Sequence, residues 1–555
     1  MQHRLRRSGR IAALTLAATL LAAGCGGGDS SNDGDNEPET TNAPTGDKDA
    51  GTPVPGGSLV YGIEADASGG YCLAVAQLAA GGIQVAQAIY DPLLALDENF
   101  KPQPFLAESY TWNDDYTALT FKLREGVTFH DGSPLTAEVV KLNIDAWRAE
   151  PETEKRTGLK SLLFRFVLQN IKDVTVDAPL TVTIHTSTPW MTLTDFLASG
   201  RSGIMAEAQI VNGEDQCKEN LIGTGPFKVL DWKPNVEMNL EKNPNYWRKS
   251  ADGAQLPYLD KLTFKPVEGG PNRFDALDAG TIQAGHFSGQ FQFDAIEETD
   301  SLYLTQEADG HMEVGYGLVQ TAKAPTDDVA VREHLAMAID REELNDINSG
   351  GKFRVADQPF DTGVIGYLED IEGIEYDPDT AEEFFAGKNL ELKLIYATDP
   401  TVKLIADAVK AQLEDVGVGV TIEEMDQATL INQALGGDFN ILLWRNHPGL
   451  DPDAQYNWWK SGSPVNFGKI NDPDIDRLLD EGRVSTDPAA REKIYQDLNR
   501  AFVAGRYNQW NWYTAWAVGA SRNVHNLTSG TLPDGSKGPG LTWGWHSLAE
   551  AWVEQ

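Results

Sequence analysis

"LTFKLREGVTFHDGSPLTAEVV", residues 119–140, carries the clearest structural signals in the chain. Leu119, Phe121 and Leu123 alternate with polar residues, which predicts a strand with one buried face. The Arg-Glu-Gly sequence at residues 124–126 predicts a turn, after which we expect residues 127–129 to pair back. The first half of the stretch therefore predicts antiparallel β-structure.

The second half of the stretch predicts a tight turn followed by a helix. Asp131 and Gly132 are typical turn residues. Thr136 can cap a helix through its hydroxyl, and Glu138 would then lie in the first turn, where the helix dipole favours negative charge. His130 and Asp131 have the chemistry of an acid–base pair, but their position in a turn before a capped helix favours a structural role.

The segments on either side alternate between strands and helices. Upstream, residues 58–63 predict an apolar strand, and Val85, Ile89 and Leu93 have helical spacing. Downstream, residues 327–344 predict a helix, and the sequences that follow, at 390–398, 401–417 and 418–426, predict a strand, an amphipathic helix and a strand. The strand–helix–strand order is typical of an α/β section built from βαβ units.

The last third of the chain continues this pattern. "FNILLWRN", residues 439–446, lacks polar alternation, which predicts a strand buried on both faces. A long helix is predicted at residues 489–504, before a short tail that resembles β-structure. Mixed β-structure first, an α/β section second and a β-like tail predict an α/β fold of two lobes, in which the chain returns to the first lobe.

The N-terminus has the layout of an export signal. Arg4, Arg6, Arg7 and Arg10 precede an apolar run at residues 11–23, which is too short to span a bilayer comfortably. The residues before Cys25, Ala-Ala-Gly, resemble the lipobox of bacterial lipoproteins, in which the cysteine receives a diacylglycerol and becomes the mature N-terminus. A plain secretory signal is the alternative. We expect a signal peptide at residues 1–24 and a flexible, glycine-rich and acidic tether at 25–56.

The composition limits the possible partners. The chain has 555 residues, 41% of them hydrophobic, and a net charge of −38. Phosphate groups would be repelled by this charge, so we expect no nucleic acid as a partner. If Cys25 carries lipid, Cys72 and Cys217 remain, and two cysteines in an exported protein favour one disulfide, with two free thiols as the alternative.

Five stretches together resemble one family in both spacing and order. They are residues 119–140, "GTGPFKV" at 223–229, "NPNYW" at 243–247, "VREHLAMAIDREEL" at 331–344 and "YDPDTAEEFFA" at 376–386. On these motifs the chain resembles the family 5 solute-binding proteins of ABC importers, the dipeptide-, oligopeptide- and nickel-binding type. The resemblance extends from about residue 57 to the C-terminus.

The resemblance implies a periplasmic-binding-protein-like fold in which two lobes enclose a solute. The first lobe is expected at residues 57–307, with an inserted subdomain at about 82–201, the second at 308–507, and the return to the first lobe at 508–555. It also implies a monomeric receptor that captures a peptide or similar small solute and delivers it to an ABC permease and ATPase complex. With the lipid anchor, the protein would work outside the cytoplasm, held at the cell membrane.

Aromatic and charged residues near the ends of the strands are the candidate binding residues. Six of the fourteen tryptophans lie between Trp444 and Trp516, where broad apolar contact would tolerate varied side chains. Arg445, at the end of a buried strand, could bind a ligand carboxylate or form a salt bridge with Asp451 or Asp453. From the first lobe we expect Tyr71 and the loop at residues 65–70. The predicted set is Tyr71, Trp444, Arg445, Asp451, Trp458, Trp510 and Trp512.

One departure from the family pattern affects the ligand. Peptide-binding members hold the α-amino group with an aspartate in the loop after this strand, and by spacing Pro448 occupies that position here. Asp451 aligns with a more C-terminal acid and is the substitute candidate for the role. A receptor for a non-peptide solute is therefore an alternative.

Catalysis and metal binding have no motif in the sequence. We find no G-x-S-x-G or H-E-x-x-H motif, and the nine histidines are scattered without paired ligand spacing. We therefore expect no catalytic residue, cofactor or metal. An extracellular hydrolase is the competing interpretation from another functional class.

Overall fold

The computed structural model describes residues 51–555, apart from 68, 77, 163, 308–309, 372 and 447–448. The predicted signal peptide, Cys25 and most of the tether lie outside the described residues. Within them, no helix combines the length and the apolar character that a membrane crossing requires.

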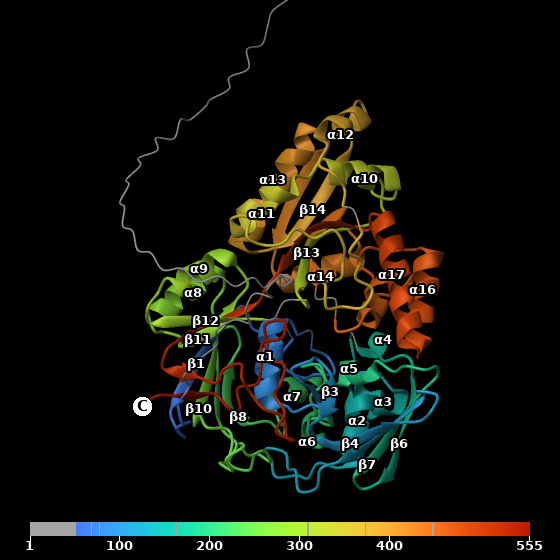
Figure 1. Cartoon of the computed structure of the whole chain (residues 1–555). Coiled ribbons are helices and arrows are strands. Elements are labelled where there is room, and N and C mark those ends of the chain that lie inside the picture. The colour runs from blue at the N-terminus through green and yellow to red at the C-terminus, as the bar shows by residue number, and fades with distance from the viewer. Residues whose placement is uncertain are drawn as a thin grey trace, which may run out of the picture. The chain divides into compact units, whose positions relative to one another are not determined.

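A seven-stranded sheet forms the centre of the first lobe (Figure 1). Its strands, in spatial order, are β12 (Leu302–Gln306), β18 (Ala517–Ser521), β11 (Ala284–Phe287), β1 (Ser58–Ile63), β10 (Lys261–Pro266), β9 (Glu237–Lys242) and β8 (Phe227–Lys233). The central strand β1 runs parallel to both β10 and β11, and the other pairs are antiparallel. The predicted strand at residues 58–63 is confirmed as β1.

A four-stranded antiparallel sheet lies within the predicted subdomain, in the order β4 (Ala107–Trp112), β5 (Ala118–Leu123), β7 (Thr181–Thr186) and β6 (Ile171–Ala178). Helix α2 (Ala137–Trp147) packs on β6 and β7 (Figure 1). Its N-cap is Thr136, whose side chain accepts from the Val139 N–H, as predicted. The predicted pairing of residues 127–129 with the preceding strand is wrong. Thr128 bridges Pro134 across the Asp131 turn, because β4 and β7 already occupy both edges of β5.

His130 has a structural role in this region. Its Nδ1 accepts from the Gly223 N–H at 3.3 Å, and its Nε2 lies 3.0 Å from the Gly225 carbonyl oxygen. Burial lowers the pKa of His130 to about 4, so the ring stays neutral at physiological pH. The imidazole therefore joins two of the motif stretches, the signature at residues 119–140 and the turn at residues 223–229.

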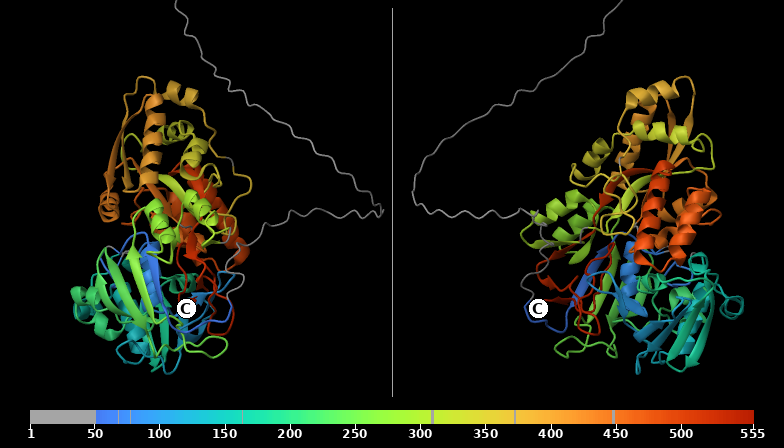
Figure 2. Two further views of the ribbon diagram at one scale, coloured as in Figure 1. Left: turned by 90° about the vertical axis from the view of Figure 1, so that its left-hand side faces the viewer. Right: turned by 45° about the vertical axis from the view of Figure 1, so that its right-hand side comes forward.

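A five-stranded sheet forms the second lobe, in the order β15 (Gly419–Met425), β14 (Glu391–Ala397), β16 (Ile441–Asn446), β13 (Glu313–Val319) and β17 (Asn508–Thr514). Helix α13 (Pro400–Asp415) connects β14 to β15, which run parallel, and packs along both (Figures 1 and 2). The predicted βαβ unit is confirmed. Strand β16 is buried on both faces as predicted, since Ile441 and Leu442 belong to different core clusters.

The strand β17 corrects one expectation. It pairs with β13 in the five-stranded sheet, although residues 508–555 are predicted to return to the first lobe. The chain rejoins the seven-stranded sheet only at β18. The exact boundaries of the lobes remain predictions.

The chain crosses between the two sheets after β12 and after β17, and the two crossing segments lie side by side. The Glu307 N–H donates to the Trp516 carbonyl oxygen at 2.9 Å, and the Trp516 N–H donates to the Glu307 carboxylate at 3.0 Å. Burial raises the pKa of Glu307 well above its ordinary value. These paired segments are the covalent connection about which one lobe can move relative to the other.

Helices and short elements complete the structure. In the first lobe these are α1 (Ala80–Ile89), α3 (Pro151–Thr157), α4 (Phe164–Val167), α5 (Leu193–Leu197), α6 (Glu207–Ile210), α7 (Glu214–Glu219), α8 (Gly270–Asp278) and α9 (Gln290–Glu297), with the pairs β2 (Leu94–Leu96)–β3 (Pro102–Pro104) and β19 (Val524–His525)–β20 (Trp552–Val553). In the second lobe they are α10 (Val329–Met337), α11 (Arg341–Ser349), α12 (Pro378–Phe385), α14 (Gln427–Gly436), the 3₁₀ turn η1 (Pro452–Gln455), α15 (Tyr456–Trp459), α16 (Pro473–Val484) and α17 (Pro488–Ala504). Helices α16 and α17 lie side by side (Figure 2).

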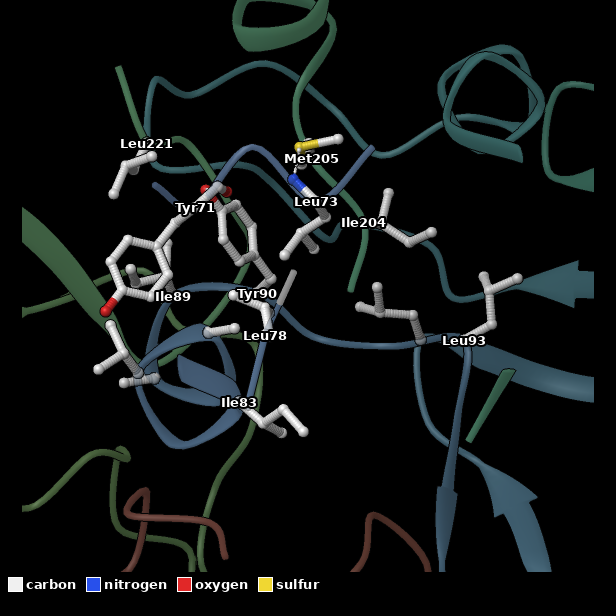
Figure 3. Packing of buried hydrophobic residues seen from close by; sticks show 14 of the residues in the cluster. Tyr71, Leu73, Leu78, Ile83, Ile89, Tyr90, Leu93, Ile204, Met205 and Leu221 are labelled. Carbon is white, nitrogen blue, oxygen red and sulfur yellow. Dashed lines mark hydrogen bonds between the residues drawn. The ribbon is translucent and has the colours of Figure 1, made fainter. Parts of the chain in front are cut away.

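A core around α1 joins the loop before this helix to the rest of the first lobe. Figure 3 shows Tyr71 and Leu73 of that loop packed with Ile89 and Tyr90. Next to them Cys72 is bonded to Cys217 of α7, with the two Cα atoms 5.1 Å apart. The two cysteines expected to pair thus cross-link α7 to the loop before α1.

Candidate functional site

Two parallel strands of the first lobe end beside each other and place polar side chains at one edge of the sheet. Tyr61 of β1 pairs with Ala284 of β11, so the residues after the two strands, Glu64 and Ser288, follow at the same edge. Ligands of α/β proteins bind at the carboxyl ends of such strands. This edge is therefore the first-lobe side of the candidate site.

Arg445, from β16 of the second lobe, reaches this edge. Its Nη1 donates to Ser288 Oγ at 2.9 Å, and its Nη2 lies 3.3 Å from both carboxylate oxygens of Glu64. The side chains of Arg445 and Glu64 remain 37% and 26% exposed. The ion pair thus connects the two lobes and keeps part of each charged group accessible.

A carboxylate and an indole hold Arg445 in place from the crossing strands. Glu313, the first residue of β13, lies 3.6 Å from Arg445 Nε, and the guanidinium stacks over the Trp516 ring at 4.3 Å. The Trp516 indole N–H in turn donates to Glu313 at 2.9 Å. Burial raises the pKa of Glu313, and the charge of Arg445 opposes this effect. The resulting site offers fixed positive and negative charge side by side.

A second contact between the lobes lies at Asp453. Its carboxylate accepts from Trp190 Nε1 at 2.7 Å and Thr192 Oγ1 at 2.8 Å, both from the first lobe, and from Arg483 Nε at 2.6 Å. Beside it lies a pocket of about 440 Å³. Residues of both lobes line this pocket: Phe166, Gln169, Asn170 and Thr188 from the first, and Tyr456, Asn457, Lys460, Ser461, Gly462, Ser463, Pro464 and Arg483 from the second.

Of the predicted binding residues, Tyr71 presents no surface to a solute in this structure, contrary to expectation. It is fully buried, its hydroxyl donates to Asp66 at 2.7 Å, and its ring packs edge-on against Trp232 at 5.3 Å. The same carboxylate accepts from Trp232 Nε1 and the Asn235 N–H. The loop at residues 65–70 is thus tied to the β8–β9 hairpin through Asp66.

Asp451 is also engaged within the protein. Its carboxylate accepts from Arg491 and from the Asp453 N–H, where it caps η1, and its side chain is 15% exposed. Asp453 pairs with Arg483. The suggested salt bridge of Arg445 to Asp451 or Asp453 is therefore wrong, because each of these acids has an arginine of its own and Arg445 pairs with Glu64 and Glu313.

The predicted tryptophans divide between core and partly open positions. Trp444 and Trp458 both pack edge-on against Phe467, at 6.0 and 5.4 Å, and keep part of their surface accessible. Trp512 is 6% exposed and belongs to the core. The backbone of Trp510 pairs with Tyr316, and its side chain lies outside the described part of the structure. Binding roles for Trp444 and Trp458 stay predictions.

Sequence reasoning missed most of the residues at the contacts between the lobes. Glu64 and Ser288 directly follow strand ends, a position that could have singled them out. Glu313 and Trp190 carry no comparable signal, because their role depends on how distant segments meet. Among the described residues, no group of three or more histidine, cysteine or acidic side chains is arranged to hold a metal ion.

The chain is similar to known bacterial binding proteins in sequence. Residues 101–467 match the family described as bacterial extracellular solute-binding proteins, family 5. The glutathione-binding protein GsiB of Pectobacterium atrosepticum is 27% identical over 430 residues, which cover 74% of this chain and 80% of the relative. GsiB of Escherichia coli K12 is 26% identical over 434 residues, with the same coverage.

Solved structures share the fold at low sequence identity. DppA from Helicobacter pylori, in complex with the peptide STSA, has a TM-score of 0.79 and 20% identity, and the match covers 90% of this chain and 99% of DppA. AppA from Bacillus subtilis, in complex with a nonapeptide, has a TM-score of 0.77 and 20% identity, with 91% and 100% covered. The family match over most of the chain and the shared two-lobed fold lead to one conclusion: this chain belongs to the bacterial extracellular solute-binding proteins of family 5.

Proposed function

We propose that this protein captures a peptide or a similar zwitterionic small solute between its two lobes and delivers it to the permease of an ABC importer. Family members are binding proteins, and the importer role follows from the family. The contact of Arg445 with Glu64 and Ser288 across the lobes is the observation that supports a zwitterionic solute. A solute bound here would touch both lobes and favour the closed arrangement.

The charges at this contact suit a solute with both an ammonium and a carboxylate. The guanidinium of Arg445 can accept a carboxylate in a bidentate manner, and Glu64 and Glu313 can accept an ammonium. Arg273 lies 3.9 Å from Glu64, so the acid sits between two arginines.

A non-peptide solute is the second candidate, and one observation favours it. Asp451, the substitute for the amino-binding aspartate of peptide receptors, is already paired with Arg491. A solute without an α-amino group would not need that acid.

The N-terminal segment bears on where the protein works. Family members are extracellular, and we propose that lipid on Cys25 holds this one at the cell membrane as a monomer, with residues 25–56 as the tether. The lobe boundary at residue 307 is supported by the change of sheet between β12 and β13, and β17 extends the second lobe past residue 507.

Titration calorimetry tests the proposal with the dipeptide Met-Leu, glutathione and N-acetyl-Met-Leu as probes. We expect at least one free-amino probe to bind one per chain, to raise the melting temperature and to be recovered intact. A saturating concentration of 100 times Kd would add about 2.7 kcal/mol to the free energy of unfolding. Tighter binding of the acetylated dipeptide would contradict the zwitterion assignment, and cleavage of a probe would contradict the receptor function.

A further inference from the structure

The side chain of Asp453 is hydrogen-bonded directly to side chains of both lobes. The carboxylate is 5% exposed and lies in η1 of the second lobe. Two of its donors, Trp190 Nε1 and Thr192 Oγ1, come from the segment between β7 and α5 in the first lobe, 263 and 261 residues away. The third donor, Arg483, comes from α16. One carboxylate thus accepts hydrogen bonds from both lobes.

The second-lobe side of this contact is held mainly by second-lobe partners, although the Arg483 guanidinium also lies over the first-lobe Trp190 ring at 4.9 Å. The guanidinium of Arg483 stacks on the Tyr456 ring at 3.5 Å, and the Asp453 N–H donates to Asp451, which pairs with Arg491. Burial raises the pKa of Asp453, but Arg483 and the two first-lobe donors outweigh this effect and lower it overall, so the carboxylate is charged. A preorganised anion therefore faces the first lobe.

The first-lobe side supplies two neutral donors. If the lobes separated, Asp453 would keep its ion pair with Arg483, and water could replace the Trp190 and Thr192 donors. Opening would therefore leave no charge unpaired, which is the penalty that makes a broken buried salt bridge so costly. A contact of this kind can form and break reversibly.

We propose that Asp453, Trp190 and Thr192 form a latch that holds the two lobes closed without contacting the captured solute. The latch sets the fraction of receptors in the closed state. Since apparent affinity scales with the fraction that is competent to bind, it adjusts the affinity for every solute by the same factor. This inference rests on the closing motion in the proposed function and is independent of the identity of the solute.

Small-angle X-ray scattering of the solute-free protein tests the latch with the double variant Trp190→Phe, Thr192→Val. Thr192→Val is nearly isosteric and removes the hydroxyl donor. Trp190→Phe removes the indole N–H but also replaces a buried indole with a smaller ring, so part of any stability loss comes from packing. Each hydrogen bond to the charged carboxylate is worth about a factor of ten, so the ratio of closed to open molecules should fall about a hundredfold. The radius of gyration should therefore rise relative to the wild-type protein.

Thr186→Val is the matched control. Thr186 is buried in the same subdomain, and its hydroxyl donates to the Thr188 carbonyl oxygen at 2.8 Å, within the first lobe. This variant should lose stability without a change in the radius of gyration. The latch is overturned if the double variant, like the control, melts earlier but keeps the wild-type radius of gyration. Failure of the latch would leave the calorimetric test of solute binding unaffected, so the two proposals fail separately.

Discussion

Arg445 and Glu64 are 381 residues apart in the sequence, and their side chains meet with Nη2 3.3 Å from each carboxylate oxygen. Arg445 is the next-to-last residue of β16 in the five-stranded sheet, and Glu64 follows the central strand of the seven-stranded sheet. The pair therefore joins the two lobes in this structure. In the proposed function, a solute that contacts both groups would favour the closed arrangement.

The first prediction concerns Arg445. Arg445→Ala removes the contact to Glu64 and Ser288 from the second lobe, so binding of a captured solute should weaken at least tenfold in calorimetry. It also removes the cation beside the buried Glu313, which keeps the Trp516 indole donor, and this should lower the free energy of unfolding by about 1–3 kcal/mol.

Arg477→Ala is the control for Arg445→Ala. Arg477 is 52% exposed and forms an i,i+4 pair with Glu481 on α16, so its loss should change stability by less than about 0.5 kcal/mol and leave binding unchanged. If Arg445→Ala lost stability with unaltered affinity, Arg445 would have only a structural role.

The second prediction concerns the disulfide. Cys72 and Cys217 should be bridged in the exported protein, so the denatured, unreduced chain should show no alkylatable thiol at either position by peptide mass mapping. Replacing both with serine should cost about 2–5 kcal/mol of unfolding free energy, because the bond closes a long loop. Two alkylated cysteines in the unreduced protein would exclude the bridge.

The third prediction is a pH dependence caused by Asp195 of α5. Burial, assisted by the charge of Asp451, raises its pKa from 3.8 to about 7; Asp453 adds to the rise, and Lys101 and Arg491 oppose it. Between about pH 4 and pH 7 the folded protein keeps a proton that the unfolded chain has lost, so the stability contributed by this group falls as the pH rises through that window.

Asp195→Asn cannot ionise and avoids that loss. The difference in melting temperature, variant minus wild type, should increase from pH 4 to pH 7. At pH 8 this difference should be positive. A difference that does not vary with pH would show that Asp195 titrates normally.

The fourth prediction concerns the anchor. Intact-mass analysis of the membrane fraction should find a chain that begins at Cys25 and carries the added mass of a diacylglycerol, and Cys25→Ser should abolish this species. A chain cleaved elsewhere and released into the medium would support the plain secretory signal instead.

The elements with strong local signals could be predicted from the sequence, and the contacts between lobes could not. Alternation identified β5, the helix-capping hydroxyl of Thr136 located the start of α2, and missing alternation identified β16 as buried. The orientation of Tyr71 could not be predicted, because the sequence around an aromatic loop residue does not distinguish one that faces a ligand from one that faces the core. In this structure Tyr71 is buried in the core.

The sequence also does not predict which distant strands pair or which distant side chains meet. Residues 508–514 have the composition of a strand, but only the three-dimensional structure shows that β17 joins β13 before the chain returns. Arg445 was identified from its position at a strand end, whereas its partners Glu64 and Glu313 come from segments whose proximity no local pattern encodes.

We propose that the two hinged lobes enclose one small solute and release it chemically unchanged. Native mass spectrometry of the protein purified from its own host, followed by denaturation and identification of the released molecule, tests it most directly. We predict one small solute per chain, which rebinds to the stripped protein with a decrease in the radius of gyration. A protein that retains no solute, or that converts the molecule it binds into a product, would contradict this account.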